Sequence, residues 1–326
     1  MEKKWVIKER GDEVVIKQLA GTLGVSESLA NLMVQRNITT GEEAKAFFYP
    51  SLDYLHDPFL MKDMNIAVDR LSTAIKRNEK ILVYGDYDVD GTTAVALVYS
   101  FLKEQYSNVE YYIPDRYKEG YGVSLQGIDH AYQKNCRLII TLDCGIKAVE
   151  KVKYARSKGI DVIICDHHYP GDEIPKAVAV LDPKQPGCSY PYKELSGCGV
   201  GFKLVHAYSR VHNIDFDRIA GYLDLVAVSI ASDIVPLTGE NRILAHFGLR
   251  QLNESPSTGL KEIIREAEIC RSLTVEDVVF KIGPRINAAG RLEKRTDAKG
   301  QTVEFAYDPA GRPLTRTVKT APGAPA

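Results

Sequence analysis

One short segment of the chain gathers acidic residues that could bind metal ions. In Gly85-Asp-Tyr-Asp-Val-Asp-Gly91, the residues Asp86, Asp88 and Asp90 occupy alternate positions. In a turn that leaves a strand, alternate carboxylates can converge on one point, and a glycine lets the backbone bend sharply. Grouped carboxylates repel one another unless cations neutralise them, and oxygen ligands suit Mn²⁺ or Mg²⁺ better than a structural zinc. An EF-hand calcium loop does not fit, because Leu97 stands where that pattern needs a glutamate. The remaining alternative is an ordinary solvated Asp-Gly turn.

A second group of candidate residues is Asp166-His-His168, at the end of the apolar run 162–165. A lone histidine is more often structural than catalytic. Two adjacent histidines after an aspartate, at the end of a predicted strand, indicate a functional site. Asp143 and Asp233 are weaker candidates, because each would more often be a helix cap than a ligand if it stood alone.

The elements that must position these residues form an alternating pattern. Short apolar runs that predict buried strands alternate with amphipathic segments such as 147–158. This alternation predicts an α/β fold, a doubly wound parallel sheet flanked by helices, preceded by a helical N-terminal segment. Two further helices are predicted over 199–211 and 216–232. The predicted strands are 81–84, 109–113, 138–142, 162–165 and 177–181.

The candidate residues all follow predicted strands. In open parallel sheets, ligands bind beyond the carboxyl ends of the strands. The three acids of the first segment follow the first strand, and Asp166 with its two histidines follows the fourth. Arg116 follows the second strand and Asp143 the third. We therefore expect these side chains at one edge of the sheet.

The order of these motifs resembles a known superfamily. Asp-x-Asp, a single Asp, Asp-His-His and a final Asp, in that order, are similar to the four motifs of the DHH phosphoesterase superfamily. Within it, the chain resembles the RecJ family of single-strand-specific exonucleases, from the N-terminal helices to about Leu292. The segments that carry the resemblance are 83–93, 113–122, 165–168 and 283–291.

The resemblance implies roles for individual residues. Tyr84 stands where many members of the superfamily have a histidine, and we expect Asp86 to compensate as a further ligand. Asp166 is expected to orient the histidine that follows it, and His168 to face the scissile phosphate. The metal ligands that the resemblance implies are Asp88, Asp90, Asp143, His167 and Asp233.

The resemblance also implies an activity. Two Mn²⁺ or Mg²⁺ ions would neutralise a phosphodiester and activate the attacking water. The implied reaction is 5′-to-3′ exonucleolytic hydrolysis of single-stranded DNA to 5′-mononucleotides, in DNA repair and recombination. The implied partners are single-stranded DNA, a helicase and a single-strand-binding protein, with the chain itself a monomer.

Two segments are expected to contact DNA. In the loop after the second predicted strand, the guanidinium of Arg116 could clamp a phosphate, although a surface salt bridge is the alternative. The second segment, residues 283–291, has small residues between polar ones, which suits contacts to DNA phosphates. For Asn287, a helix-start turn after Pro284 explains the residue equally well. The predicted DNA contacts are Arg116, Tyr121, Gly122, Arg285, Asn287 and Arg291.

Composition limits the class of protein. Of 326 residues, 44% are hydrophobic and 26% charged, as in soluble globular enzymes. The sequence has no apolar run long enough for a membrane helix and no secretory signal at its start, which predicts a cytoplasmic protein without membrane contact. Six scattered cysteines without a C-x-x-C pair predict reduced, mostly buried thiols. The net charge of −1 argues mildly against a general nucleic-acid binder, unless the acids are gathered at a metal centre.

The sequence divides into three parts: a helical segment over 1–75, a catalytic domain over 76–292 and a tail over 293–326. Thr296–Leu314 resembles one unit of tyrosine–aspartate (Rhs-type) repeats, which cannot bury its apolar face alone. Residues 320–326 are small and proline-rich, which predicts disorder. We expect a catalytic core cut short after the DHH domain, with weak and poorly processive activity.

Two other functions remain open. The first is a DHH phosphodiesterase that acts on short oligonucleotides or cyclic dinucleotides; the N-terminal helices and the loop of Arg116 favour the exonuclease over it. The second is a non-catalytic DNA-binding scaffold, against which the complete set of five implied ligands argues.

Overall fold

The structure is a computed structural model that describes residues 6–289, 294–296, 302–307 and 313–319. The chain divides into two compact units, residues 1–55 and 56–326. No helix in the described part of the chain is both long enough and apolar enough to cross a membrane.

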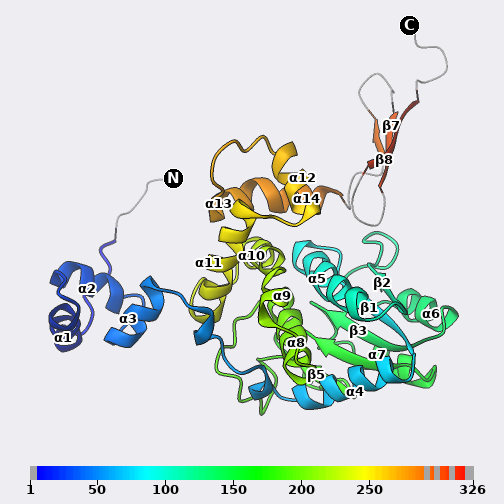
Figure 1. Ribbon diagram of the computed structural model, residues 1–326, viewed down its shortest axis with the longest axis horizontal. Coiled ribbons are helices and arrows are strands. Elements are labelled where there is room, and N and C mark those ends of the chain that lie inside the picture. The colour runs from blue at the N-terminus through cyan, green and yellow to red at the C-terminus, as the bar shows by residue number, and fades with distance from the viewer. Residues whose placement is uncertain (1–5, 290–293, 297–301, 308–312, 320–326) are drawn as a thin grey trace, which may run out of the picture. The chain divides into compact units, whose positions relative to one another are not determined.

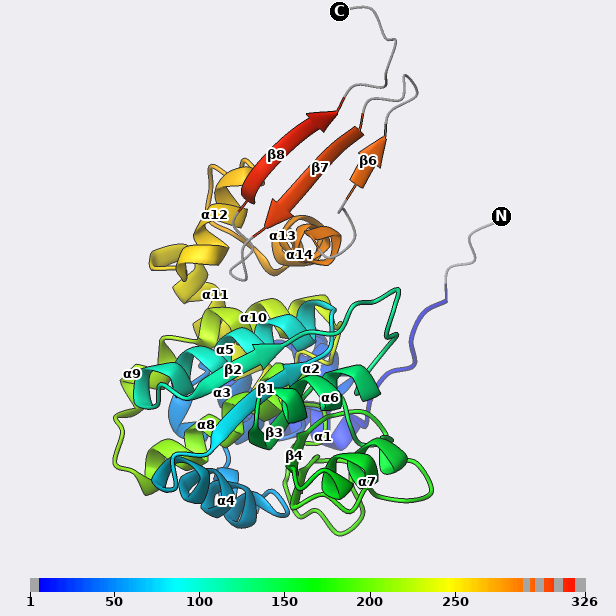
Figure 2. The same cartoon turned by 90° about the vertical axis from the view of Figure 1, so that its right-hand side faces the viewer.

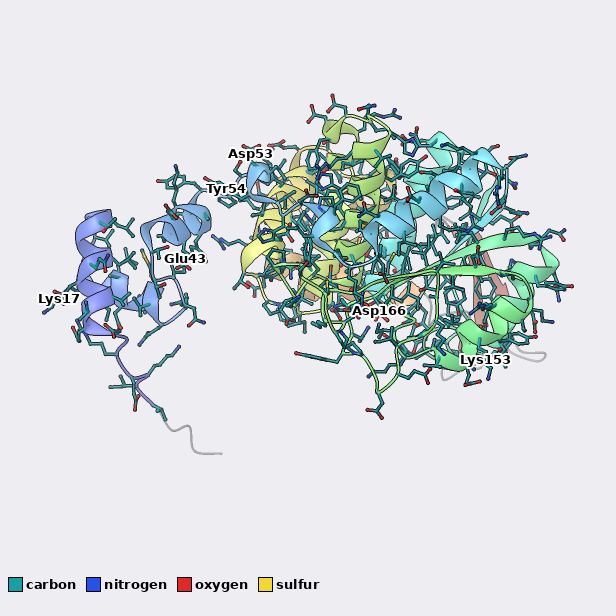
Figure 3. The ribbon with its side chains drawn as sticks, turned by 90° about the horizontal axis from the view of Figure 1, so that it is seen from below. Lys17, Glu43, Asp53, Tyr54, Lys153 and Asp166 are labelled. Carbon is teal, nitrogen blue, oxygen red and sulfur yellow. The ribbon has the colours of Figure 1, made fainter. Side chains whose placement is uncertain are left out.

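The N-terminal unit is helical, as predicted. Its helices begin at side-chain caps, and Thr40 and Glu43 (the latter labelled in Figure 3) form a capping box at the third one. Apolar side chains from all three helices close a small core around Leu19 and Met33. The elements are α1 (Glu13–Leu23), α2 (Glu27–Val34), α3 (Gly41–Phe48) and the short 3-10 helix η1 (Leu52–Tyr54).

The second unit is built on a five-stranded sheet in the order β2-β1-β3-β4-β5, in which every neighbouring pair is parallel. Each predicted strand contains one of these strands or most of it, so the predicted α/β fold with a parallel sheet is confirmed. The strands are β1 (Lys80–Gly85), β2 (Val109–Tyr112), β3 (Cys136–Leu142), β4 (Asp161–Cys165) and β5 (Ala179–Leu181).

Helices cover both faces of this sheet (Figure 1). One face packs against α4, α5 and α8, and the other packs against α6 and α7. Side chains alternate between the faces along each strand. Leu82 and Tyr84, for example, join the apolar cluster formed with α6 and α7. The helices are α4 (Met64–Lys76), α5 (Val89–Gln105), α6 (Leu125–Gln133), α7 (Val149–Ser157) and α8 (Gly197–Val211).

A second layer of helices packs outside α5 and α8. The predicted helix over 216–232 is two helices, α9 (Phe216–Ala220) and α10 (Leu223–Ser232), separated at Gly221. α10 contacts α5, α8 and α11. The remaining elements are η2 (Pro58–Leu60), α11 (Gly239–Glu254), α12 (Thr258–Glu266), α13 (Val275–Asp277), the π-helix η3 (Val278–Ile282) and α14 (Gly283–Ala289).

A separate antiparallel sheet follows in the sequence (Figure 2). It consists of β6 (Lys294–Thr296), β7 (Thr302–Tyr307) and β8 (Pro313–Lys319), with β7 in the middle. The predicted disorder of residues 320–326 concerns residues outside those that the structure describes.

A buried ion pair connects α8 and α11. The ammonium of Lys203 donates to Oε1 of Glu240 at 2.6 Å and to the carbonyl of His56 at 3.0 Å. The other carboxylate oxygen of Glu240 accepts a hydrogen bond from the hydroxyl of Tyr190 at 2.6 Å. Lys203 and Glu240 are 0% and 1% exposed, so each charge depends on the other for its stability.

Removal of this ammonium should destabilise the second unit strongly. Lys203→Met leaves the carboxylate of Glu240 buried without its cation, so the free energy of unfolding should fall by about 3–5 kcal/mol in urea titrations. The double variant Lys203→Met/Glu240→Gln buries no net charge and should lose less. If the double variant is as unstable as the single one, the buried charge is not the cause.

Candidate metal centre

The carboxyl ends of the central strands carry aspartates. Asp86, Asp143 and Asp166 directly follow β1, β3 and β4. Their backbone N–H groups continue the hydrogen bonds of the sheet, as when Asp143 donates to the carbonyl of Cys165 at 2.9 Å. The strand order reverses between β1 and β3, and such a switch point is where open parallel sheets bind their ligands. The predicted gathering of these residues at one edge is therefore observed.

The imidazole of His167 lies at the centre of an acidic cluster. Its Nε2 atom is 3.1 Å from Oδ1 of Asp143 and 3.6 Å from Oδ2 of both Asp90 and Asp233. His167, Asp90 and Asp143 are 5%, 1% and 1% exposed. Among the described residues, neither ring nitrogen of His167 has a hydrogen-bond partner, and Oδ1 of Asp143 also lacks one. Buried polar atoms without partners are costly, and oxygen atoms around an imidazole nitrogen fit a divalent cation such as Mn²⁺ or Mg²⁺.

Two helices hold Asp90 in place. Asp90 lies in the first turn of α5, and its carboxylate accepts hydrogen bonds from the N–H groups of Gly197 and Cys198 at the start of α8. The hydroxyl of Ser229 on α10 also donates to it at 2.7 Å. Only glycine fits at position 197, because a Cβ atom there would lie 2.6 Å from the Cβ of Asp143. The N-terminal ends of α5 and α8 therefore both offset negative charge at the cluster.

Asp143 and Asp233 enter the cluster from positions outside the regular elements. Asp143 adopts a left-handed conformation (φ 58°), which aspartate tolerates better than most residues. Asp233 follows the last residue of α10 as its C-cap. The C-terminal end of a helix carries partial negative charge, so this position favours a bound cation.

The electrostatics of the cluster favour a cation or a proton. Burial, and then the neighbouring carboxylate of Asp90, raise the pKa of Asp143 well above its usual value. The same two causes raise the pKa of Asp233 to about 7. Burial raises the pKa of Asp86 to about 6. Burial lowers the pKa of His167, which keeps its imidazole neutral, and only the neutral form can bind a metal.

His168 has different partners. Its Nδ1 atom donates to Oδ1 of Asp166 at 2.8 Å, and its Nε2 atom is 3.1 Å from the hydroxyl of Tyr121. Burial raises the pKa of Asp166, but the hydrogen bonds that it accepts, first among them the one from His168, outweigh burial and lower it overall. From the resemblance we expect Asp166 to orient the histidine that follows it. The backbone N–H of His167 does donate to Oδ1 of Asp166 at 2.8 Å, but the imidazole that Asp166 contacts is that of His168, because the ring of His167 is turned toward the other aspartates.

Tyr84 stabilises the loop beside the cluster. Its buried hydroxyl donates to the carbonyl of Gly122 at 2.9 Å and accepts from the N–H of Ser124 at 3.1 Å. The N–H of Gly122 donates to Oδ1 of Asp86 at 3.0 Å, and this glycine has a φ of 79°. In place of the histidine that the resemblance leads us to expect at this position, the chain therefore has a side chain that holds the loop of Tyr121.

Among the described residues, two groups of side chains around His167 could hold a metal ion. Neither group includes Asp86 or Asp88. Oδ1 of Asp88 caps α5 by accepting the N–H of Gly91 at 3.0 Å. Oδ2 of Asp86 is buried and has no partner among the described residues. Their predicted role as metal ligands stays a prediction.

The predicted DNA contacts are dispersed. The guanidinium of Arg116 lies 4.9 Å above the ring of Tyr87. Arg285 donates to the carbonyl of Lys281 on its own helical segment at 2.9 Å. Asn287 lies within α14, which continues directly from η3, whereas Arg291 lies outside the described residues. These DNA contacts also stay predictions.

Sequence reasoning missed two acidic residues. Asp182 directly follows β5, is 0% exposed, and its Oδ2 atom has no partner among the described residues. Burial raises its pKa to about 7. The strand-end rule would have found Asp182, because the strand before it was predicted. Glu119 accepts hydrogen bonds from the N–H of Asp115 and the hydroxyls of Tyr112 and Ser124, and no sequence signal indicated this role.

Three thiols lie close to the cluster. Cys144 follows Asp143, Cys165 precedes Asp166, and Cys198 is in the first turn of α8. All three are free and buried, as predicted. Burial, and then the nearby aspartates, raise the pKa of each thiol.

Comparison with protein families places this arrangement in a known class. Residues 80–230 match the model of the DHH family, N-terminal domain. This stretch contains all five strands of the parallel sheet, so residues 80–230 form a domain of the DHH family.

Within that family, the chain is similar to RecJ. It is 42% identical to the single-stranded-DNA-specific exonuclease RecJ of Bacillus subtilis (strain 168) over 296 residues, which are 90% of this chain and 37% of that protein. It is 38% identical to RecJ of Escherichia coli (strain K12) over 70% of this chain and 41% of that protein. The chain thus spans about two fifths of these relatives.

Solved structures give the same result. A crystal structure of exonuclease RecJ bound to manganese has a TM-score of 0.66 and 32% identity, over 74% of this chain and 60% of that one. RecJ from Thermus thermophilus in complex with Mn²⁺ has a TM-score of 0.72 and 27% identity, over 87% of this chain and 40% of that one. The predicted tail is also confirmed as Rhs-like, because residues 287–322 match the model of the RHS repeat.

Binding of a metal ion should stabilise the chain through Asp143. At a Mn²⁺ concentration near 100 times its Kd, the Tm should rise by about 5–10 °C, because the ion binds only the folded state. Asp143→Asn should abolish this rise in a thermal-shift assay, whereas the surface variant Asp172→Asn should keep it. An undiminished rise of the Tm in Asp143→Asn would show that Asp143 is not a metal ligand.

The stability of the metal-free chain should depend on the ionisation of Asp233. Its pKa is raised from 3.8 to about 7, so the folded state binds more protons than the unfolded state between these values, and stability falls as pH rises through them. In EDTA, Asp233→Asn should therefore match the parent at pH 4 and be more stable at pH 8. Thermal unfolding at both pH values tests this, and a difference that does not change with pH contradicts it.

Proposed function

We propose that this chain is a metal-dependent 5′-to-3′ exonuclease that hydrolyses single-stranded DNA to 5′-mononucleotides, in DNA repair and recombination. The observation that carries the proposal is the convergence of three carboxylates on Nε2 of His167, beside the Asp166–His168 pair. The similarity of the chain to RecJ supports single-stranded DNA as the substrate.

The proposed cofactors are two Mn²⁺ or Mg²⁺ ions, since RecJ structures are described with each of them. Asp90, Asp143, His167 and Asp233 would hold them, with Asp86 and Asp88 as further ligands. When bound, such ions supply charge neutralisation at the phosphodiester and a nucleophile derived from water.

The side chains of the protein would orient the substrate. His168 is held at Nδ1 by Asp166 while its side chain remains 41% exposed, so it can face a phosphate at the cluster. The hydrogen bond to Asp166 raises the pKa of His168, which favours the cationic form that stabilises developing negative charge. The guanidinium of Arg116 would bind a neighbouring DNA phosphate. Tyr121 and Gly122, in the same loop, would also contact the DNA. Arg285, Asn287 and Arg291 are the other proposed DNA contacts.

The remaining expectations belong to the same proposal. Residues 76–292 would form the catalytic domain, residues 1–75 a helical segment before it, and residues 293–326 a distinct tail. The chain would act as a cytoplasmic monomer, with a helicase and a single-strand-binding protein as partners.

The activity can be tested directly. Mononucleotides should be released from a 5′-labelled single strand only when Mn²⁺ is present, and Asp143→Ala should release none. His168→Ala should lower the rate about 10²–10³-fold, because it removes a group that stabilises the transition state, and should keep the Mn²⁺ thermal shift. A duplex of the same sequence is the substrate control.

Other outcomes would favour the other functions. Faster turnover of a dinucleotide or cyclic dinucleotide than of the long strand would favour a small-substrate phosphodiesterase. Tight DNA binding without metal-dependent cleavage would favour a scaffold. A loss of both activity and metal binding in His168→Ala would make His168 a ligand and not a group that faces the substrate.

A further inference from the structure

An exposed arginine beside the metal centre lies over an aromatic ring. Cζ of Arg116 lies 4.9 Å from the ring centroid of Tyr87. Tyr87 stands between Asp86 and Asp88 in the turn from β1 to α5, whereas Arg116 belongs to the loop after β2. The fold therefore brings together two segments that are separate in the sequence.

A row of ring contacts leads from Tyr87 to His168. The rings of Tyr87 and Tyr121 meet edge to face, with centroids 6.2 Å apart and an interplanar angle of 86°. The ring of Tyr121 then meets that of His168 at 6.0 Å and 81°, in addition to the hydrogen bond between them. We call Arg116, Tyr87, Tyr121 and His168 the aromatic ladder.

The guanidinium at the end of the ladder is not neutralised by the acid next to it. The carboxylate of Asp115 accepts hydrogen bonds from the N–H groups of Tyr117 and Lys118, and lies 3.5 Å from the ammonium of Lys118. Arg116 is exposed. A guanidinium that lies over an aromatic ring makes no conventional hydrogen bond with it, so its N–H donors remain available to bind a phosphate in a bidentate manner.

We propose that Tyr87 is a positioning residue for DNA binding. Its ring holds the guanidinium of Arg116 over the turn that carries Asp86 and Asp88, so that this guanidinium meets a DNA phosphate already oriented. This inference rests on the proposed function and deepens it. An arginine side chain has many rotamers, and holding it before binding lowers the entropy lost when DNA binds.

The contact uses the ring of Tyr87 and not its hydroxyl, which gives a matched pair of variants. Tyr87→Leu removes the ring, and Tyr87→Phe keeps it. Phe247→Leu is a control for the loss of such a contact elsewhere, because the guanidinium of Arg250 lies 4.8 Å from the ring of Phe247 on α11.

The experiment measures binding of a fluorescent, hydrolysis-resistant phosphorothioate single strand in Mn²⁺. Tyr87→Leu should weaken binding about two- to fivefold, the equivalent of one exposed cation–π contact. Tyr87→Phe and Phe247→Leu should bind as the parent does. In an Arg116→Ala background, Tyr87→Leu should have no further effect, because the side chain that it positions is absent.

Two readouts separate this role from others. The rise in Tm caused by Mn²⁺ should be unchanged in Tyr87→Leu; a smaller rise would mean that Tyr87 supports the metal ligands, which overturns the proposal. Equal weakening in the parent and Arg116→Ala backgrounds also overturns it. If the parent does not bind DNA, this result contradicts the proposed function but not the contact between Tyr87 and Arg116. The ladder is still tested by the NMR signal of the Arg116 Nε–Hε group, which Tyr87→Leu should shift to the position of a free arginine.

Discussion

The organisation of the second unit depends on one electrostatic constraint. Carboxylates buried in one place repel each other and lose their hydration, so they need compensating positive charge. The structure supplies this charge differently to each of them. Backbone N–H groups of α8 serve Asp90, and the ring of His168 serves Asp166. Asp143 has no such partner on Oδ1 among the described residues, and its ionised form needs a cation.

The parallel sheet explains why these charges meet at all. The cluster draws residues from the ends of β3 and β4, from the start of α5 and from the end of α10. These residues are distant in the sequence and become neighbours only in the folded chain. Metal binding is therefore coupled to folding, and an unfolded chain offers no comparable group of ligands. The close approach of Gly197 to Asp143 is part of the same arrangement.

The sequence predicted the strands and the edge at which the functional residues meet, because burial and the strand-end rule act on residue order alone. It did not predict the directions of individual side chains. The pairing of Asp166 with His168, and the inward ring of Tyr84, depend on which neighbours occupy the remaining space. The donors to Asp90 come from α8 and α10, more than 100 positions later in the chain. No local pattern near Asp90 could have indicated them.

The burial of the three thiols around the cluster has a consequence for their reactivity. A thiol must lose its proton before it can bind a metal. Cys144, Cys165 and Cys198 are buried beside negative carboxylates, and both conditions oppose the formation of a thiolate. In the metal-free chain these thiols therefore stay protonated, and a protonated thiol is a poor nucleophile that resists oxidation. The carboxylates that require a cation thus also keep the neighbouring sulfur atoms unreactive.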